Sequence, residues 1–577
     1  MHLLLVRKAL FFVLLAVCAV LVNAGSRPSM RLIPPFRSFL IALLPAGLAA
    51  RQVVPGAGEL QDQGTLPQFE TMRDSLPSPI YDEEPELVQV YWKAWELAFR
   101  HFHQPHPGSG FPAQFIDAAF NQNIFLWDTA FMTMFCNVAY GLVPGIRSLD
   151  NFYAKQHQSG EICREINRTT GVDFTPWQNR ERAPLFSRWG FNTGVGQVQI
   201  QYTGRTSPSP PPELTLDALN NPVPAWAELE SFAFTGDSAR LRMVRDPLVR
   251  YYRALQKYLR QGNGLYVTDW ASMDNSPRNP FLAGGGTGVD ISSQMVLFAR
   301  QLGVIDSVTG NPDWRLWERE ADSLAAQINR LMWDPDRRFY FDLTAEGRRI
   351  HVKTIAAFWT LLAGVAGPGQ SAALAEELQN PATFGRTHPV PSCAADEPAY
   401  VSWGGYWRGA VWPSTNTMVI RGLQRCGYAD LAREIALKHV HAVASVCRRT
   451  GTIWENYAPD SIAPGRHVDR KPVVADMVGW SGIGPILYFM EFAVGLTPDA
   501  PSNTLLWDMR SIKRSGCERF RFNGHTLSLV STPDREGAGM RVDVTSDGPF
   551  TLVVLRRGVR RSVAIPRGTT SLSLPPG

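Results

Sequence analysis

Residues 480–494 read WSGIGPILYFMEFAV, and a helix with this sequence would be apolar on nearly every face. Residues 314–332, WRLWEREADSLAAQINRLM, carry their charged side chains on one side, as a helix facing water does. Helical periodicity predicts twelve helices between residues 84 and 497, and the two kinds alternate along the chain. Two concentric rings of six helices would explain this alternation, because only the helices of an inner ring contact protein on all sides. The sequence therefore predicts a mainly α fold, an (α/α)6 barrel, rather than an irregular α-solenoid, which would show a repeat of fixed period.

The first of these helices begins near residue 84. The others are predicted at residues 128–139, 145–158, 222–236, 237–260, 290–303, 312–332, 352–364, 369–379, 413–426, 428–449 and 479–496. The loops before the even-numbered helices are the segments richest in Trp, Asp, Glu and Gly. If the even helices form the inner ring, these loops share one rim of the barrel.

The N-terminal segments differ in composition from the barrel. Residues 1–50 contain two apolar runs that each follow basic residues and are shorter than the roughly 20 residues of a membrane-spanning helix. We expect a signal peptide region starting at Met1 or Met30, and hence a periplasmic or secreted protein without a stable membrane span after processing. A membrane anchor is the alternative. Residues 51–83 are rich in Pro and Gly and predict a linker or extended arm.

The C-terminal segment changes to short runs of alternating polarity, which indicate strands. Residues 498–577 are therefore expected to form a small β-sandwich-like domain, separate from the barrel domain of residues 84–497. The formal net charge of +5 comes from basic residues within the first fifty positions, so the chain without them is neutral. Nucleic acid is not an expected partner.

The loop before the tenth predicted helix mixes aromatic, basic and glycine residues. Residues 404–416 read GGYWRGAVWPSTN. Tyr406, Trp407 and Trp412 offer flat faces on which a sugar ring can stack, and Arg408 offers several donors for hydroxyl groups. This mixture favours a sugar-binding site, and a buried aromatic corner of the core is the alternative.

Two rim loops supply carboxyl groups suited to cleaving a glycosidic bond, which usually takes one protonated and one ionised group. Asp274 lies before the sixth helix among short polar and turn-forming residues, and Glu455 lies before the twelfth helix between aromatic neighbours. Helices six and twelve face each other across a six-fold ring, so the carboxyl groups would be widely separated and would favour inversion. The alternative for each is a structural carboxylate that caps a helix or pairs with an arginine.

Four segments resemble glycoside hydrolase family 63 and the related mannosylglycerate hydrolase-like proteins. They are residues 125–129 (FLWDT), 273–278 (MDNSPR), 406–413 (YWRGAVWP) and 455–457 (ENY). The resemblance covers residues 84–497 and implies an (α/α)6 barrel and an inverting mechanism on α-linked sugars. It also implies Asp274 as general acid and Glu455 as general base. The sequence departs from the family at Asn275, where a second acid is common.

The same matching places sugar-binding residues in the rim loops. Trp127 and Asp128 would help to form the sugar pocket together with Trp407 and Arg408. The candidate substrate-binding residues in these loops are Trp127, Asp128, Trp270, Arg278, Tyr406, Trp407, Arg408, Trp412, Tyr457, Asp476 and Trp480. We expect an oligosaccharide or a small glycoside as substrate, with no cofactor and no metal ion.

Three alternatives stay open. Asp460, Asp469 and Asp476 lie in the same loop as Glu455 and are other candidates for the base, although Asp476 also resembles a sugar-binding position. A non-catalytic carbohydrate-binding protein would keep the aromatic residues but could lose one carboxyl group. A polysaccharide lyase with an (α/α)6 barrel commonly uses Tyr and His, and the motifs around the candidate carboxyl and aromatic groups contain no His.

Overall fold

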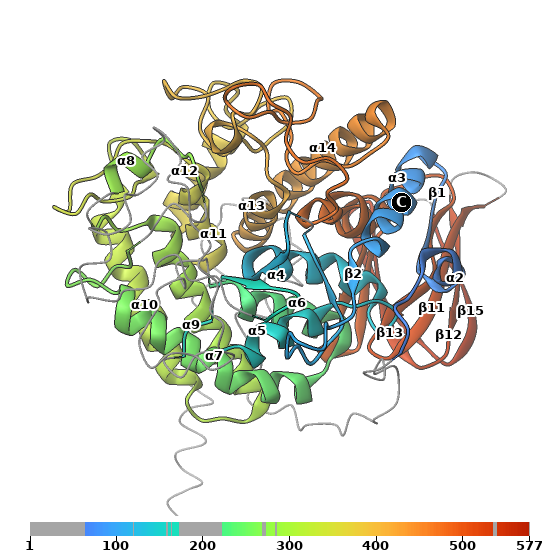
Figure 1. Cartoon of the computed structure of the whole chain (residues 1–577). Coiled ribbons are helices and arrows are strands. Elements are labelled where there is room, and N and C mark those ends of the chain that lie inside the picture. The colour runs from blue at the N-terminus through green and yellow to red at the C-terminus, as the bar shows by residue number, and fades with distance from the viewer. Residues whose placement is uncertain are drawn as a thin grey trace, which may run out of the picture. The chain divides into compact units, whose positions relative to one another are not determined.

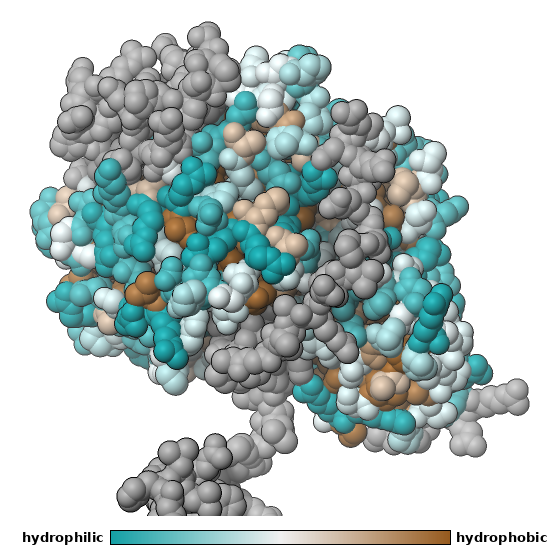
Figure 2. All heavy atoms as spheres, turned by 90° about the horizontal axis from the view of Figure 1, so that it is seen from below, coloured by the Kyte–Doolittle hydropathy of each residue, from teal (hydrophilic) through white to brown (hydrophobic). Residues whose placement is uncertain are grey.

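The computed structural model describes residues 64–118, 120–156, 160–162, 164–171, 222–267, 273–282, 285–534 and 539–575. The predicted signal peptide region, the first part of the predicted linker and the candidate residue Trp270 lie outside these ranges. Within them, none of the helices combines the length and the apolar character needed to cross a bilayer. The face shown in Figure 2 carries mainly hydrophilic side chains, with hydrophobic ones in small separate areas.

All twelve predicted helices have a helical counterpart in the described residues. One alternating set consists of α3(Pro85–Phe99), α5(Asp150–Ala154), α7(Ser238–Leu259), α10(Trp314–Leu331), α12(Pro368–Gln379) and α14(Ala429–Thr450). The other consists of α4(Leu126–Cys136), α6(Pro224–Thr235), α9(Val289–Thr309), α11(Trp359–Ala363), α13(Pro413–Arg425) and η6(Trp480–Ile483), which continues as η7(Gly484–Val494). All of α4 and all of η7 are buried, whereas α10 buries one stripe. The predicted alternation of solvent-facing and enclosed helices is therefore present.

The second set of helices closes into a ring. α4 packs on α6, α6 on α9, α9 on α11, α11 on α13, α13 on η6, and η6 on α4. Helices of the first set cover this ring. α7 and α10 pack on α9 (Figure 1), and α3 and α14 pack on η7. The predicted (α/α)6 barrel is confirmed, and α9 and η6 stand three places apart in its inner ring of six.

Proline and glycine set the ends of several inner helices. Pro224 and Pro413 occupy the first turn of α6 and α13, where the missing N–H leaves no hydrogen bond unmade. Gly236 and Gly364 end α6 and α11 in the left-handed conformation. Because α13 begins at Pro413, the aromatic segment that precedes it lies at the N-terminal end of an inner helix.

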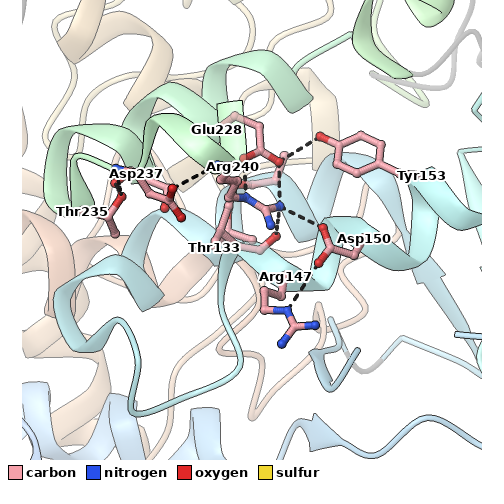
Figure 3. Close-up of polar contacts among 11 residues, drawn as sticks. Thr133, Arg147, Asp150, Tyr153, Glu228, Thr235, Asp237 and Arg240 are labelled. Carbon is pink, nitrogen blue, oxygen red and sulfur yellow. Dashed lines mark hydrogen bonds and ion pairs between the residues drawn. The ribbon is translucent and has the colours of Figure 1, made fainter. Parts of the chain in front are cut away.

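A buried ion cluster ties α6 to its neighbours (Figure 3). Glu228 of α6 is 1% exposed and accepts hydrogen bonds from Arg240 Nε and Nη2 of α7, at 2.7 and 2.8 Å. Glu228 also accepts one from the Tyr153 hydroxyl at 3.0 Å, and Arg240 Nη2 donates to Asp150 Oδ1 of α5 at 3.0 Å. The guanidinium charge compensates the burial of its carboxylate partners, so the cluster holds α5, α6 and α7 together.

Two mainly antiparallel β-sheets come mostly after the helices in the sequence. The first has the order β1(Ser78–Tyr81), β10(Ser515–Phe522), β11(His525–Pro533), β12(Met540–Ser546) and β15(Gly568–Leu574). The second has the order β14(Val559–Ile565), β13(Phe550–Arg556), β9(Thr504–Asp508) and β8(Leu496–Asp499). Phe522 and Phe550 meet edge to face between them, 6.0 Å between ring centroids. The predicted C-terminal β region is confirmed, and β1, from the segment predicted as a linker or extended arm, adds an edge strand to it.

Short elements fill the loops. They are α2(Phe69–Met72), η1(Arg73–Ser75), β2(Phe102–His103), β3(Phe115–Ile116), β4(Asn123–Phe125), η2(Asn137–Ala139), η3(Ile146–Leu149), β5(Glu165–Asn167), α8(Asn279–Leu282), β6(Trp333–Asp334), β7(Phe339–Tyr340), η4(Ile355–Phe358), η5(Tyr406–Arg408) and η8(Ala500–Ser502). One of them, η5, carries candidate residues of the aromatic segment, and α8 directly follows the Asp274 loop.

Candidate active site

Glu455 lies on the loop between α14 and η6 and is 2% exposed. Its Oε1 accepts a hydrogen bond from the Tyr406 hydroxyl at 2.9 Å, and its Oε2 accepts one from the Val474 N–H at 3.3 Å. The Glu455 carbonyl accepts a hydrogen bond from Trp480 Nε1 at 2.7 Å, which fixes the loop to the start of η6. Burial raises the pKa of Glu455 to about 7, because the carboxylate loses hydration and these donors are neutral.

Asp274 is a second carboxyl group with a shifted pKa. It lies in the loop before α8 and α9, and burial raises its pKa to about 7, opposed by the positive charge of Arg164. The negative charge of Asp274 adds to the raised pKa of Glu455. The pKa values of both carboxyl groups therefore lie in the neutral range. Near neutral pH, one member of the pair can donate a proton while the other accepts one.

Asp128, in the first turn of α4, is another buried carboxyl group, and it lies near Glu455. Burial raises its pKa well above the usual range, and the charges of Asp117 and Glu455 raise it further. Its Oδ1 is among the buried polar atoms of the described residues that have no hydrogen-bond partner. The neighbouring Trp127 is 8% exposed and packs edge-on against Phe131, with ring centroids 4.7 Å apart. An unpaired buried oxygen beside an aromatic ring is suited to bind a ligand hydroxyl group.

The aromatic segment forms one group of rings beside Glu455. Trp407 and Trp412 stack face to face, with centroids 4.2 Å apart and planes 6° apart. Tyr406 and Trp480 meet Trp412 edge-on, at 4.8 and 5.6 Å. The rings largely cover one another, as the alternative of an aromatic core corner requires. Tyr406 and Trp480 also bind Glu455 directly, so the cluster holds the candidate base in place.

Three residues outside the predicted set act on the aromatic segment or on Asp274. The Asn275 side chain bonds to the backbone of the aromatic segment, at Gly405 and Trp407. His467 stacks on the ring of Tyr406, with centroids 4.9 Å and planes 22° apart. Arg164 acts on Asp274 through its charge. Only Asn275 had a signal in the sequence, as a departure from the family motif.

Arg278 lies inside the protein and not at the barrel rim. It is 0% exposed, and its guanidinium pairs with Asp290 of α9 and with Asp342 at 3.1 Å. The predicted role of Arg278 in substrate binding is therefore replaced by a structural one, because the side chain is fully buried and both of its terminal nitrogens already bind carboxylates. These ion pairs hold the Asp274 loop against α9.

The side chains of Tyr457 and Asp476 bind partners other than the two candidate carboxyl groups. Tyr457 is 0% exposed, and its hydroxyl accepts a hydrogen bond from the Trp454 N–H at 3.3 Å. Asp476 is exposed and binds the Thr452 hydroxyl. The structure therefore places neither side chain with the predicted sugar-binding group.

The other acids of the Glu455 loop have partners of their own. Asp460 accepts a hydrogen bond from Arg386 Nε at 2.6 Å. Asp469 is exposed and pairs with Lys471 at 2.8 Å. Glu455 is buried, and burial raises its pKa to about 7, so the structure favours it as the candidate base.

Comparisons with known proteins agree with this architecture. Residues 205–469 match the family model described as mannosylglycerate hydrolase MGH1-like glycoside hydrolase domain. The mannosylglycerate hydrolase of Thermus thermophilus is 39% identical over 106 residues, which are 18% of this chain and 25% of that enzyme. An uncharacterized protein of Borreliella burgdorferi is 25% identical over 362 residues, which are 61% of this chain and 75% of that protein.

Solved structures show the same fold at low identity. A GH63 mannosylglycerate hydrolase from Thermus thermophilus, in complex with glucose, matches with a TM-score of 0.50 and 20% identity, over 68% of this chain and 98% of that one. The α-L-rhamnosidase of Streptomyces avermitilis, complexed with L-rhamnose, matches with a TM-score of 0.53 and 12% identity, over 86% of this chain and 42% of that one.

The fold and the family match together define the class of protein, an (α/α)6-barrel glycosidase. Within that class the chain is GH63-like, as its motifs predict. Its residues 205–469 carry a glycoside hydrolase domain of the mannosylglycerate hydrolase MGH1-like type.

Proposed function

We propose that this glycoside hydrolase cleaves an α-linked sugar with inversion of configuration, with Asp274 as general acid and Glu455 as general base. The observation that carries the proposal is a pair of interacting carboxyl groups whose pKa values are both raised to about 7. General acids and bases work best when their pKa lies near the working pH. At neutral pH, one carboxyl group can therefore be protonated and donate a proton while the other is ionised and accepts one.

The proposed reaction moves two protons. Protonated Asp274 gives its proton to the glycosidic oxygen as the bond between that oxygen and the anomeric carbon breaks. Ionised Glu455 takes a proton from water, whose oxygen forms the new bond to the anomeric carbon on the opposite face. The hydrogen bonds that Glu455 accepts from Tyr406 and Val474 stabilise its ionised form and support its role as the base.

The arrangement of the barrel supports inversion. The Asp274 loop is tied to α9 by Arg278, and the Glu455 loop is tied to η6 by Trp480. Because α9 and η6 stand opposite each other in the inner ring, we propose that the two carboxyl groups act on the sugar from opposite sides. A separation of about 6.5 to 9.5 Å leaves room for a water molecule, as an inverting enzyme needs.

The proposed substrate is an oligosaccharide or a small glycoside. Asp128 would bind a sugar hydroxyl through its unpaired Oδ1, and Trp127 and Trp407 would border the sugar ring. The matching relatives named mannosylglycerate hydrolases make α-mannosides and their glycerate conjugates the first candidates. α-Glucosides are the next class to test.

We also propose that the protein is exported by a signal peptide within residues 1–50, and that residues 84–497 form the catalytic domain, followed by a β-rich domain of residues 498–577. The basic residues followed by short apolar runs support export. N-terminal sequencing of the mature protein from a periplasmic fraction tests this proposal, and an intact Met1 in a cytoplasmic fraction would contradict it.

Hydrolysis by the purified protein tests the proposed activity. Aryl and natural α-glucosides, α-mannosides and glycerate conjugates form the substrate panel, and free reducing sugar is the readout. Release of sugar from one member supports the proposal. Sugar binding by calorimetry without any turnover would favour a non-catalytic carbohydrate-binding protein. An unsaturated product absorbing in the ultraviolet, formed from a uronate polymer, would indicate a lyase.

A further inference from the structure

One amide side chain clamps the turn that carries Tyr406. Asn275 Nδ2 donates a hydrogen bond to the Gly405 carbonyl at 3.0 Å, and Asn275 Oδ1 accepts one from the Trp407 N–H at 2.8 Å. The two bonded groups belong to the peptide units immediately before and after Tyr406. A third hydrogen bond, from Arg408 Nε to the Asn275 carbonyl at 3.3 Å, joins the same two loops.

The clamped turn has a backbone conformation that needs support. Gly405 and Tyr406 both adopt the left-handed region, with φ of 54° and 64°. Glycine takes this conformation freely, whereas a residue with a Cβ takes it at a cost and keeps it only where surrounding contacts hold it. The two hydrogen bonds from Asn275 are such contacts, and they fix the direction of the Tyr406 side chain.

Both candidate catalytic groups depend on this clamp. Asp274 directly precedes Asn275 in the chain, so the hydrogen bonds that anchor the Asn275 side chain also restrain the backbone of Asp274. The Tyr406 hydroxyl donates a hydrogen bond to Glu455 Oε1 at 2.9 Å, so the position of the Glu455 carboxylate depends on the clamped turn. We propose that Asn275 is a positioning residue that sets the geometry between Asp274 and Glu455. This inference rests on the proposed hydrolase function.

The clamp requires an amide. Gly405 presents an acceptor and Trp407 a donor, so the side chain between them must donate and accept at the same time. Asn275→Asp could keep the bond from Trp407 but would turn a second oxygen toward the Gly405 carbonyl. It would also add a negative charge next to Asp274. The positioning role therefore accounts for an amide where the related family commonly has an acid.

Two variants and a matched control test the role by kinetics. We expect Asn275→Ala to lower kcat by about tenfold or more with little change in KM, because the acid–base geometry is lost while the binding groups remain. We expect Asn275→Asp to lower kcat and also to move the alkaline limb of the pH profile upward, because the added charge raises the pKa of Asp274. Asn263→Asp is the control, since Asn263 Oδ1 accepts a hydrogen bond from the Leu265 N–H at 2.9 Å that a carboxylate can also accept.

Hydrogen exchange gives a readout that does not need activity. The Trp407 amide should exchange faster in Asn275→Ala and Asn275→Asp than in the wild type, and at the wild-type rate in Asn263→Asp. Asn275→Asp nearly keeps the native side-chain size, so it replaces the alanine variant if that one does not fold.

Wild-type kcat in Asn275→Ala, or an unchanged exchange rate of the Trp407 amide in both variants, would overturn the positioning role. A wild-type protein that hydrolyses none of the glycosides would instead overturn the proposed function. In that case the exchange rates still decide whether Asn275 holds the turn.

Discussion

Glu228 and Glu455 are both buried glutamates on the inner ring or its loops, but their neighbours differ. Glu228 accepts two hydrogen bonds from the Arg240 guanidinium, whose charge opposes the burial that raises the pKa of Glu228 (Figure 3). Glu455 accepts its hydrogen bonds from a hydroxyl and a peptide N–H, and the charge of Asp274 adds to the burial that raises the pKa of Glu455 to about 7. For these two glutamates, the hydrogen-bond partner thus separates a carboxylate that is paired with a guanidinium from one that only neutral groups bind.

The largest expected difference between the two regions is in catalysis. Asp274→Asn and Glu455→Gln should each fold normally and lower kcat about 10²- to 10⁴-fold, because each removes general acid or base assistance. Steady-state kinetics on the best substrate of the glycoside panel measures the loss. Turnover near the wild-type rate in either variant would remove that residue from the mechanism.

The ion cluster should respond in stability and not in chemistry. Arg240→Met leaves Glu228 buried without its cation, so we expect a loss of about 3–5 kcal/mol in unfolding free energy. The folded fraction should keep the wild-type kcat. The double variant Arg240→Met/Glu228→Leu should recover much of the stability, because the uncompensated charge is gone.

Thermal unfolding and kinetics on the same samples measure both properties. A large fall in kcat with unchanged stability in Arg240→Met would contradict the distinction between the two regions.

The raised pKa of Asp274 predicts how stability changes with pH. The folded-state value of about 7 lies above the ordinary value of 3.8, so the folded protein binds this proton more tightly than the unfolded chain does. Its contribution to stability is fully present below about pH 4 and is lost as pH rises through about 7. The wild type should therefore lose about 2 kcal/mol more between pH 5 and pH 8 than Asp274→Asn does.

Denaturant unfolding at the two pH values checks this difference. Asp336→Asn, at an exposed aspartate, is the matched control and should follow the wild type. Equal losses in the wild type and Asp274→Asn would show that burial does not shift this carboxyl group.

Removing the Tyr406 hydroxyl, a neutral hydrogen-bond donor to Glu455, should give the smallest change in activity. Tyr406→Phe deletes the hydrogen bond to Glu455 Oε1, which stabilises the ionised carboxylate, so the pKa of Glu455 should rise. The acidic limb of the kcat/KM profile should move upward by about half to one pH unit, since a net hydrogen bond contributes about 1 kcal/mol. Tyr457→Phe is the control, because the Tyr457 hydroxyl bonds to Trp454 instead. An unmoved acidic limb in Tyr406→Phe would show that this hydrogen bond does not tune the base.

The helices could be predicted because their pattern is local. Residues such as Leu87, Tyr91 and Trp95 recur at helical spacing, and all three are buried in α3 as that spacing predicts. The pairing of β1 with β10 could not be predicted, because it joins Ser78 to Glu518 across the whole barrel. No local pattern specifies a partner at that distance in the sequence.

The residues of the candidate site likewise divide into those that the sequence predicts and those that it does not. Asp274 and Glu455 stand in motifs that resemble a family, and the structure brings both into one electrostatic environment. Arg278 looked like a rim residue in the same motif, but its burial depends on Asp290 and Asp342, which belong to other segments. The contacts of Asn275 likewise join positions 130 residues or more apart. A sequence motif therefore locates the chemical groups but not the residues that hold them.

The stereochemistry of the first product tests the central claim most directly. If Asp274 and Glu455 act on opposite sides with a water molecule between base and sugar, an α-linked substrate must release a β-configured sugar first. Proton NMR recorded before mutarotation resolves the two anomers. The account predicts that the β-anomer signal appears first. Initial release of the α-anomer, or a glycosyl group trapped on Glu455, would contradict it and make Glu455 a nucleophile.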